Sequence, residues 1–215
     1  MLASSDKNLG LFETLKVTNS KPVFFQEHWD RFAHSCSTLG PHCPLSYSEL
    51  EAQCTQNLPT EGFLKYTLLN NKLTIETGPP RYTPADFKRG FRLTFSNTPR
   101  PTTDRLYKFK TTCYDFTERH KAQQAGFDDC IFLTPEGYIT ETSIANIFFR
   151  IGKTLYTPSL DCPILPGIIR AKIIEREENV VEGLFKREIL LDADEIFLTN
   201  SLMGAMEVRE VKSVI

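Results

Sequence analysis

The sequence lacks any long apolar run: no stretch of about 18 consecutive apolar residues occurs, which is the length that a membrane-spanning helix needs. The first residues also lack the positively charged and apolar regions of a signal peptide. Nor is there a surplus of one charge, because 25 lysines and arginines stand against 27 aspartates and glutamates. Proteins that bind a phosphate backbone need an excess of basic residues. We therefore expect a cytoplasmic protein whose partners include neither a membrane nor a nucleic acid.

The cysteines and histidines are too scattered for a metal site. The six cysteines include no C-x-x-C pair and no short spacing to a histidine. His28 and His34 share a predicted helix, but at a separation of six residues they lie on different faces. Cys113 would need a base partner to act as a nucleophile, and none is apparent. We expect free thiols and no metal.

The first half of the 215-residue chain has the periodicities of a small α+β unit. Leu11, Glu13, Leu15 and Val17 alternate with the residues between them, which predicts a strand with these four side chains on one side. The further elements expected are a helix over residues 25–39 that ends at Gly40, a helix from the capping box at Ser46 to about Asn57, a hairpin of residues 63–69 and 73–75 that turns at Asn70 and Asn71, and a strand over residues 91–95.

A stretch rich in proline, serine, threonine and asparagine, residues 96–104, predicts a linker. We therefore expect a small N-terminal domain over residues 1–97, a linker over 98–106 and a larger C-terminal domain over 107–215. In the second half we expect helices over residues 112–125 and 168–175, and strands over residues 130–133, 138–140, 145–150 and 195–198.

Three features of the second half could carry chemistry. Lys110 follows an apolar residue at a probable strand end, where a lysine can lose its charge and become a nucleophile. Glu141 ends a hydrophobic strand and precedes small polar residues that would let a flat ligand approach. Gly167 opens a helix whose free amides could bind phosphate. Each feature alone is also typical of a solvated surface.

Together, and in this order, these features resemble the class IV aminotransferase family, the pyridoxal-phosphate enzymes of fold type IV. The motifs that carry the resemblance are Gly10-Leu-Phe-Glu-Thr14, Glu27-His-Trp-Asp-Arg31, Lys110-Thr-Thr-Cys-Tyr114, Glu136-Gly-Tyr-Ile-Thr-Glu141 with Asn146, Leu165-Pro-Gly-Ile-Ile-Arg170, and the segment from Asp194 to Ser201. The resemblance runs from about Gly10 to Val211. It implies an α+β fold of two domains, a small one and a larger one with a barrel-like sheet and flanking helices.

The resemblance assigns a role to each residue of these motifs. Lys110 should form the Schiff base with pyridoxal 5'-phosphate and then move a proton at the substrate carbon. Glu141 should pair with the pyridine nitrogen of the cofactor. The other cofactor-binding residues implied are Arg31, the amides of Ile168 and Ile169 and the hydroxyl of Ser201 for the phosphate, Tyr114 for the ring oxygen, and Asn146. The resemblance also implies a homodimer.

The family contains both amino-acid transaminases and 4-amino-4-deoxychorismate lyases, and these motifs are common to both. The segment Thr199-Asn-Ser-Leu-Met203 resembles the lyase branch, whereas transaminases more often have Gly-Thr-Ala there. Similarly, Gly167-Ile-Ile-Arg170 lacks the threonine that transaminases commonly carry in the phosphate-binding turn. Both marks favour the lyase.

The lyase would take a small amine that bears a carboxylate and release p-aminobenzoate and pyruvate by β-elimination, a step of folate biosynthesis. The alternatives are a branched-chain or D-amino-acid transaminase and a relative that binds the cofactor without turnover. From composition alone, a soluble module that is not an enzyme also fits. Four arginines are candidates for the substrate carboxylate, and each could equally be a surface residue: Arg81, Arg92, Arg100 and Arg105.

Overall fold

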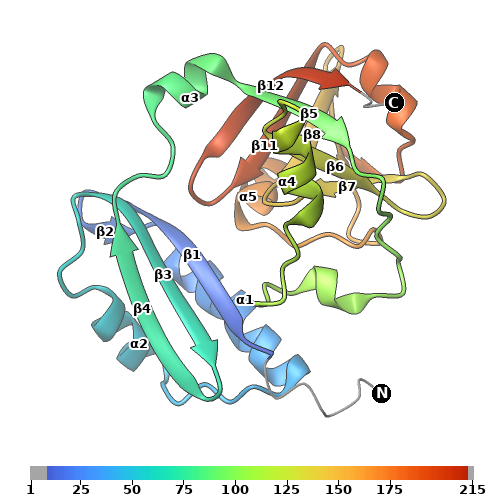
Figure 1. Ribbon diagram of the computed structural model, residues 1–215. Coiled ribbons are helices and arrows are strands. Elements are labelled where there is room, and N and C mark those ends of the chain that lie inside the picture. Colours follow the sequence, from blue (N-terminus) through green and yellow to red (C-terminus); the bar gives the residue numbers. More distant parts are fainter. Residues whose placement is uncertain (1–8, 213–215) are drawn as a thin grey trace. The chain divides into compact units, whose positions relative to one another are not determined.

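The computed structural model describes residues 9–212, and the chain forms two compact units. The first unit comprises the described residues up to Arg81 together with Phe109–Tyr114. The second comprises Tyr82–Lys108 and the described residues from Asp115 onward. Each unit combines one sheet with a few helices, which confirms the α+β class (Figure 1).

The described part of the first unit contains a four-stranded sheet in the order β2-β1-β3-β4. Its elements are β1 (Leu11–Thr18), β2 (Lys21–Pro22), α1 (Phe25–Leu39), α2 (Tyr47–Cys54), β3 (Glu61–Leu69) and β4 (Lys72–Gly78). Each pair of neighbouring strands is antiparallel. The turn between β3 and β4 is made by Asn70 and Asn71, both at positive φ, as the hairpin prediction requires.

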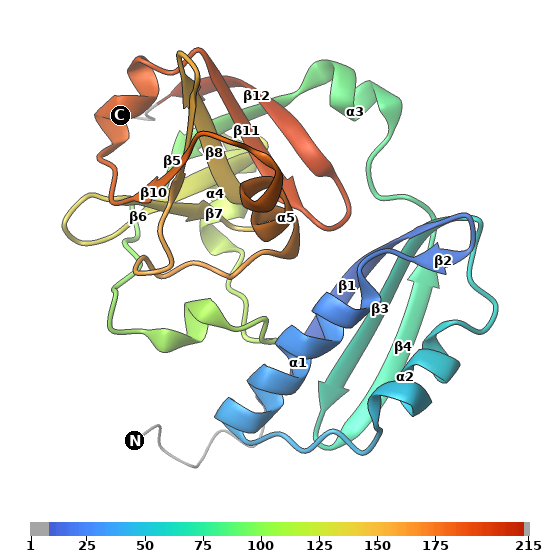
Figure 2. The same ribbon diagram turned by 180° about the vertical axis from the view of Figure 1, so that it is seen from behind.

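Both helices of the first unit lie on the same face of its sheet, in front of it in Figure 2. The alternation of β1 sends Leu11, Leu15 and Val17 into the core beneath them, as predicted. Helix α1 contributes Phe25 and Phe32 to this core and ends at Gly40, whose amide donates to the carbonyl of Cys36. The capping box at Ser46 opens α2, also as predicted.

The described part of the second unit is built around an eight-stranded sheet in the order β10-β9-β8-β11-β12-β5-β6-β7. The strands are β5 (Phe91–Phe95), β6 (Asp129–Leu133), β7 (Ile139–Thr142), β8 (Asn146–Ile151), β9 (Thr154–Pro158), β10 (Val180–Gly183), β11 (Glu195–Asn200) and β12 (Gly204–Lys212). The turn from Thr142 to Ala145 leads β7, at one end of this order, directly into β8. The sheet is therefore curled, which agrees with the expected barrel-like form.

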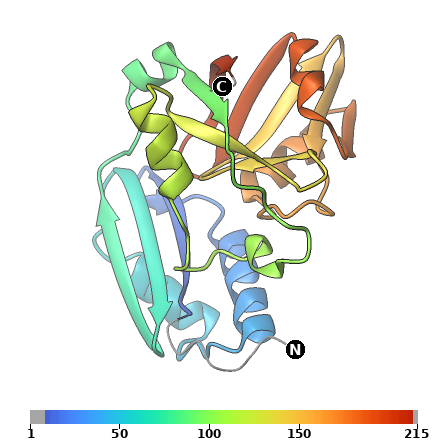
Figure 3. The same cartoon turned by 45° about the vertical axis from the view of Figure 1, so that its right-hand side comes forward.

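Helices flank this second sheet. They are α3 (Pro84–Arg89), α4 (Thr117–Gln124) and α5 (Ile168–Arg176), with 3₁₀ turns η1 (Arg105–Lys108) and η2 (Arg187–Leu191). Figure 3 shows α4 beside the sheet, where its Ala122 packs with Cys130 and Phe132 of β6. The main core of the unit lies inside the curl and is formed largely by aliphatic and aromatic residues of β5, β8, β11 and β12.

Two expectations about elements were wrong. The strand Phe91–Phe95 was expected in the first half, but it pairs in parallel with β12 and β6 of the second sheet. Its partners are more than thirty residues away in sequence, so local periodicity could not identify them. The helix expected over residues 112–125 begins only at Thr117. The amide and hydroxyl of Thr112 instead bond to Gly10, which holds this stretch beside β1.

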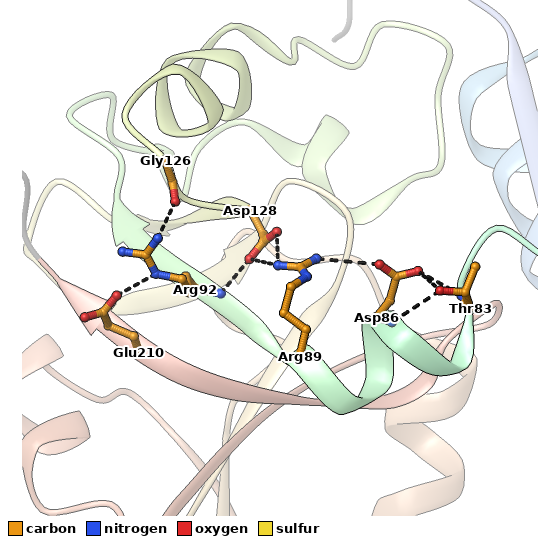
Figure 4. A network of polar contacts seen from close by, with 7 residues as sticks. All are labelled: Thr83, Asp86, Arg89, Arg92, Gly126, Asp128 and Glu210. Atoms are coloured by element: carbon orange, nitrogen blue, oxygen red, sulfur yellow. Dashed lines mark hydrogen bonds and ion pairs between the residues drawn. The ribbon is translucent and has the colours of Figure 1, made fainter.

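A polar network fixes α3 and β5 to the second unit (Figure 4). Thr83 caps α3, an element that we did not predict: its hydroxyl accepts from the amide of Asp86, whose carboxylate in turn accepts from the amide of Thr83. Arg89 pairs with Asp128 at 2.7 Å, and Arg92 pairs with Glu210 of β12 at 2.7 Å. Asp128 also accepts from the amide of Arg92 at 2.8 Å. These contacts explain why the segment from Tyr82 belongs with the second sheet.

All six cysteines are free thiols, as expected. Within residues 9–212, no group of three or more histidine, cysteine, aspartate or glutamate side chains is placed to hold a metal ion. None of the helices in this range combines the length and the apolar character needed to cross a membrane.

Candidate active site

Lys110 is held at the edge of β1 by backbone hydrogen bonds. Its carbonyl accepts from the amide of Phe12 at 3.0 Å, and the amide of Thr112 donates to the carbonyl of Gly10 at 2.8 Å. The hydroxyl of Thr112 accepts from the Gly10 amide at 3.0 Å. A Cβ at Gly10 would lie 2.8 Å from the same hydroxyl, so this close approach requires glycine. The backbone of Lys110 is thus fixed relative to β1.

The amine of Lys110 lies over aromatic rings. Its Nζ is 4.6 Å from the ring centroid of Phe12 and 5.7 Å from that of Tyr114. The two rings contact each other edge to face, with centroids 5.9 Å apart. Aromatic rings attract a cation, but they also take the place of water around it. The surroundings of this amine therefore differ from those of a solvated surface lysine. Lys65 also approaches the Phe12 ring, with its Nζ at 5.7 Å.

Arg31 is bound to a buried carboxylate. Glu13, only 1% exposed, accepts from Nε of Arg31 at 2.8 Å and from its Nη2 at 2.6 Å. The same carboxylate contacts Nδ1 of His28, itself fully buried, at 2.7 Å. Strand β1 supplies the carboxylate and helix α1 supplies both of its side-chain partners, because positions 28 and 31 are about one turn apart on the same side of the helix.

The ionisation of this cluster follows from burial and charge. Burial alone would raise the pKa of Glu13, but the charge of Arg31 and the contacts with His28 lower it to about 2. Burial lowers the pKa of His28 below its usual value, and the positive charges of Arg31 and Lys110 lower it further. The negative charge of Glu13 acts in the opposite direction but does not outweigh them. His28 is therefore neutral near pH 7. Facing an ionised carboxylate, its Nδ1 carries the proton and donates it to Glu13.

In the second unit, Glu141 is held by three donors. It is 5% exposed and lies in β7. Nη1 of Arg100 donates to its Oε1 at 2.8 Å, while Nδ2 of Asn146 and the amide of Leu165 donate to its Oε2 at 2.9 and 3.2 Å. A carboxylate with these donors is fixed in position and stabilised as the ion.

Asn146 connects this carboxylate to the start of α5. Its Nδ2 also donates to the carbonyl of Leu165 at 3.0 Å, and its Oδ1 lies where a Cβ of residue 167 would stand, so that position requires glycine. Gly167 is the N-cap of α5, and no side chain caps this helix. The amides of its first turn, at buried Ile168 and half-buried Ile169, are of the kind that bind anions.

The turn after β11 is closed by a side chain. Oδ1 of Asn200 accepts from the amides of Leu202 and Met203, both at 2.9 Å, and its Nδ2 donates to the carbonyl of Ile144 at 3.2 Å. Ser201, half-buried, lies within this turn. The adjacent Thr199 has a buried Oγ1 for which the described residues provide no hydrogen-bond partner.

The structure thus brings the predicted site residues together in two groups. Lys110, Tyr114 and Arg31 belong to the first unit, and Glu141, Asn146, Ile168, Ile169 and Ser201 belong to the second. Their individual roles toward a cofactor stay predictions. The sequence analysis gave no role to Glu13 or His28, and it named Arg100 only among four candidates for the substrate carboxylate. A carboxylate on the apolar face of β1 was the signal for Glu13, whereas nothing local distinguished Arg100 from other arginines.

The α+β fold, with two curled sheets and few helices, matches the fold-type IV aminotransferase structures, and the family comparison agrees. The family model described as "Amino-transferase class IV" matches residues 10–211. The chain therefore belongs to the class IV aminotransferase family, which comprises pyridoxal-phosphate-dependent lyases and aminotransferases.

Individual relatives include both kinds of enzyme. A solved structure from Legionella pneumophila, described as a putative 4-amino-4-deoxychorismate lyase, is 31% identical with a TM-score of 0.88 and covers 96% of this chain and 84% of its own. The aminodeoxychorismate lyase of Bacillus subtilis is 40% identical over 88 residues, which span 39% of this chain but only 30% of that protein. A probable branched-chain-amino-acid aminotransferase of Rickettsia bellii is 27% identical over 95% of this chain and 77% of its own.

Proposed function

We propose that this protein is a pyridoxal-phosphate-dependent 4-amino-4-deoxychorismate lyase, which releases p-aminobenzoate and pyruvate. The turn after β11 is the observation that carries the proposal. Its asparagine side chain forms three hydrogen bonds, to Leu202, Met203 and Ile144. The Gly-Thr-Ala sequence common in transaminases has no side-chain amide that could make these bonds. The similarity to the Legionella structure supports the same choice.

The donor set fits pyridoxal phosphate. The second unit offers a helix start without a side-chain cap and, nearby in β11, a buried hydroxyl of Thr199 without a partner, both suited to an anion or the water around it. It also offers the carboxylate of Glu141, fixed by its donors. The first unit offers the amine of Lys110 beside two rings and the guanidinium of Arg31. These are the groups that an aldehyde, a phosphate and a pyridine nitrogen would require.

When bound, the cofactor would supply a sink for the electron pair left by removal of a proton. Arg31, the amides of Ile168 and Ile169 and the hydroxyl of Ser201 would hold its phosphate, Tyr114 its ring oxygen and Glu141 its ring nitrogen. Asn146 would keep Glu141 oriented. Lys110 would bond the cofactor in the resting enzyme.

Lys110 would then act as the base. Its free amine would remove the proton from the carbon that bears the substrate amine. The C–O bond to the enolpyruvyl group on the adjacent carbon would break, the ring would become aromatic, and the leaving group would take up a proton to become pyruvate. No amino-group acceptor is needed, which distinguishes this reaction from transamination.

The test is to load the purified protein with pyridoxal phosphate, add aminodeoxychorismate and follow pyruvate. We expect pyruvate without any added keto acid, and none with Lys110→Ala. Absence of pyruvate from the loaded wild-type protein would overturn the lyase.

The second candidate is a branched-chain aminotransferase, because the Rickettsia bellii aminotransferase matches 95% of this chain. If this protein is such an aminotransferase, it would release no pyruvate in the same assay. Instead it would transfer the amino group of leucine, isoleucine or valine to 2-oxoglutarate. The two assays on one preparation therefore decide between the candidates.

The remaining proposals concern the pathway, the compartment and the oligomeric state of the protein. Release of p-aminobenzoate would place the protein in folate biosynthesis, and the family resemblance supports a homodimer; the cytoplasm stays the expected compartment. A mass of twice 24.6 kDa in solution by light scattering would support the dimer, and a monomer that is active at the same concentration would contradict it.

A further inference from the structure

Arg100 is an arginine buried where its sequence suggests a surface. It lies between β5 and η1, and its amide donates to the carbonyl of Leu133 at 2.8 Å. The residue is only 5% exposed. Its guanidinium lies 3.9 Å from the ring centroid of Phe132 and 4.8 Å from that of Tyr107. These rings leave the planar group little freedom to turn.

The guanidinium is directed at Glu141 and at the residue after it. Nη1 donates to Oε1 of Glu141 at 2.8 Å, and Nη2 lies 3.4 Å from the carbonyl of Thr142. Both side chains of the pair are nearly excluded from water, at 6% and 7% exposed. An arginine does not lose its proton in proteins, so its buried charge needs an anion beside it. Protonation of Glu141 would leave that charge uncompensated.

We propose that Arg100 is a positioning residue that keeps Glu141 ionised and thereby keeps a proton on the cofactor's ring nitrogen. The second half of this statement rests on the proposed function, because it needs the cofactor opposite Glu141. A proton shared between a carboxylate and a pyridine nitrogen can reside on either. With Arg100 beside the carboxylate, the proton is favoured on the nitrogen, where it strengthens the electron sink.

The first half of the proposal is tested without any cofactor. Arg100→Met should lower the thermal midpoint of the apoprotein, because the buried carboxylate of Glu141 loses the positive charge that lies 2.8 Å from it. Adding Glu141→Gln should then raise the midpoint again, whereas Glu141→Gln alone should lower it. The matched control is Arg92→Met, which breaks a more exposed pair with Glu210 in the same sheet and should not respond to Glu141→Gln. Additive effects of Arg100→Met and Glu141→Gln would overturn the proposal.

The second half is read from the protonation of the bound ring. Trapping with borohydride and peptide mass analysis first establishes whether the cofactor is bonded to Lys110; failure here in the wild-type protein would refute the proposed function while the apoprotein result stands. The ¹⁵N resonance of ring-labelled pyridoxal phosphate then reports the proton.

We expect a protonated nitrogen in the wild-type and Arg92→Met proteins. Arg100→Met should lower the ratio of protonated to unprotonated nitrogen by about 10- to 1,000-fold. This range corresponds to the about 1 to 3 units by which an arginine typically lowers the pKa of a neighbouring carboxyl group. Arg100→Lys, which keeps the charge, should restore the protonated resonance. A merely structural role would weaken cofactor retention in both variants without moving the resonance. An unchanged resonance in loaded Arg100→Met would overturn the proposal.

Discussion

Glu13 and Arg31 form a two-pronged ion pair at distances of 2.8 and 2.6 Å, and the carboxylate is almost completely buried. Arg31 is the residue that the family motif assigns to the cofactor phosphate. Its orientation is therefore set by a carboxylate on the opposite element, β1, before any phosphate is bound. Several consequences of this and the other clusters can be measured.

Removal of the Glu13 carboxylate should lower the free energy of unfolding. Glu13→Ala leaves the charge of Arg31 uncompensated in the core, which typically costs about 3–5 kcal/mol. We expect this loss in the free energy of unfolding from urea titrations. The control is Glu76→Ala, which removes the exposed partner of Lys65 at 3.5 Å and should cost about 1 kcal/mol or less. Equal losses in the two variants would show that the Glu13 pair is not a buried one.

Acid should weaken the protein through the same carboxylate. The pKa of Glu13 is about 2 in the folded protein, against a usual 4.5, so the unfolded chain takes up the proton first as the pH falls. The stability it provides is complete above about pH 5 and is lost toward pH 2. At about 1.4 kcal/mol per pKa unit, the loss is roughly 3 kcal/mol. Unfolding free energies measured at intervals from pH 5 to pH 3 should show about half of this loss in the wild-type protein and none of it in Glu13→Gln.

His28 should cause a separate loss of stability at a higher pH than Glu13 does. Its folded pKa lies below the usual 6.5, because burial opposes the charged form. The unfolded chain therefore binds a proton near pH 6.5 that the folded protein does not, and stability falls as the pH drops below that value. We expect this part of the profile to persist in Glu13→Gln and to vanish in His28→Gln. A wild-type stability that is flat between pH 7 and 5.5 would contradict a neutral buried His28.

Lys110 should differ chemically from its neighbour Lys65, although both amines approach the ring of Phe12. After incubation with pyridoxal phosphate and reduction with borohydride, peptide mass analysis should find the adduct on Lys110 at stoichiometric yield. Lys110→Ala should abolish it, and Lys65→Ala should leave it unchanged. An adduct on Lys65 in the wild-type protein, or its loss in Lys65→Ala, would contradict Lys110 as the residue of attachment.

Gly167→Ala should strain the second cluster without straining the backbone, since φ is −72° at this residue. The new Cβ would overlap Oδ1 of Asn146, the side chain that holds Glu141. Overpacking of this kind costs about 1–3 kcal/mol. In the double variant with Asn146→Ala the clash is gone, so the two losses should not add in a thermal unfolding cycle. If the stability losses of Gly167→Ala and Asn146→Ala add, the new Cβ does not clash with Asn146.

Local sequence patterns predicted the elements whose partners are close in the chain. The alternation of β1 put Glu13 on the same side as Leu11 and Leu15, and two asparagines predicted the turn between β3 and β4. The strands β9, β10 and β12 were not predicted, and β5 was placed in the wrong half because its hydrogen bonds go to distant strands. Period and turn chemistry do not encode such pairings.

The same limit applies to the site. Lys110, Glu141 and Arg31 were predicted as site residues because a family motif marks them, and their roles stay predictions. Arg100 was grouped with three other arginines as a candidate for binding the substrate carboxylate. Only the packing of β6 and η1 around it shows that its partner is Glu141.

The chain passes between the two units three times, after Arg81, after Lys108 and after Tyr114. On the ribosome, the first unit therefore cannot be completed when its sheet has been made, because the segment that carries Lys110 emerges later. The second sheet is completed later still: β5 emerges early, but its neighbour β12 is the last strand of residues 9–212. Until β12 has been made, the edge of β5 opposite β6 has no partner strand, and exposed edges of this kind make nascent chains prone to aggregation and dependent on chaperones.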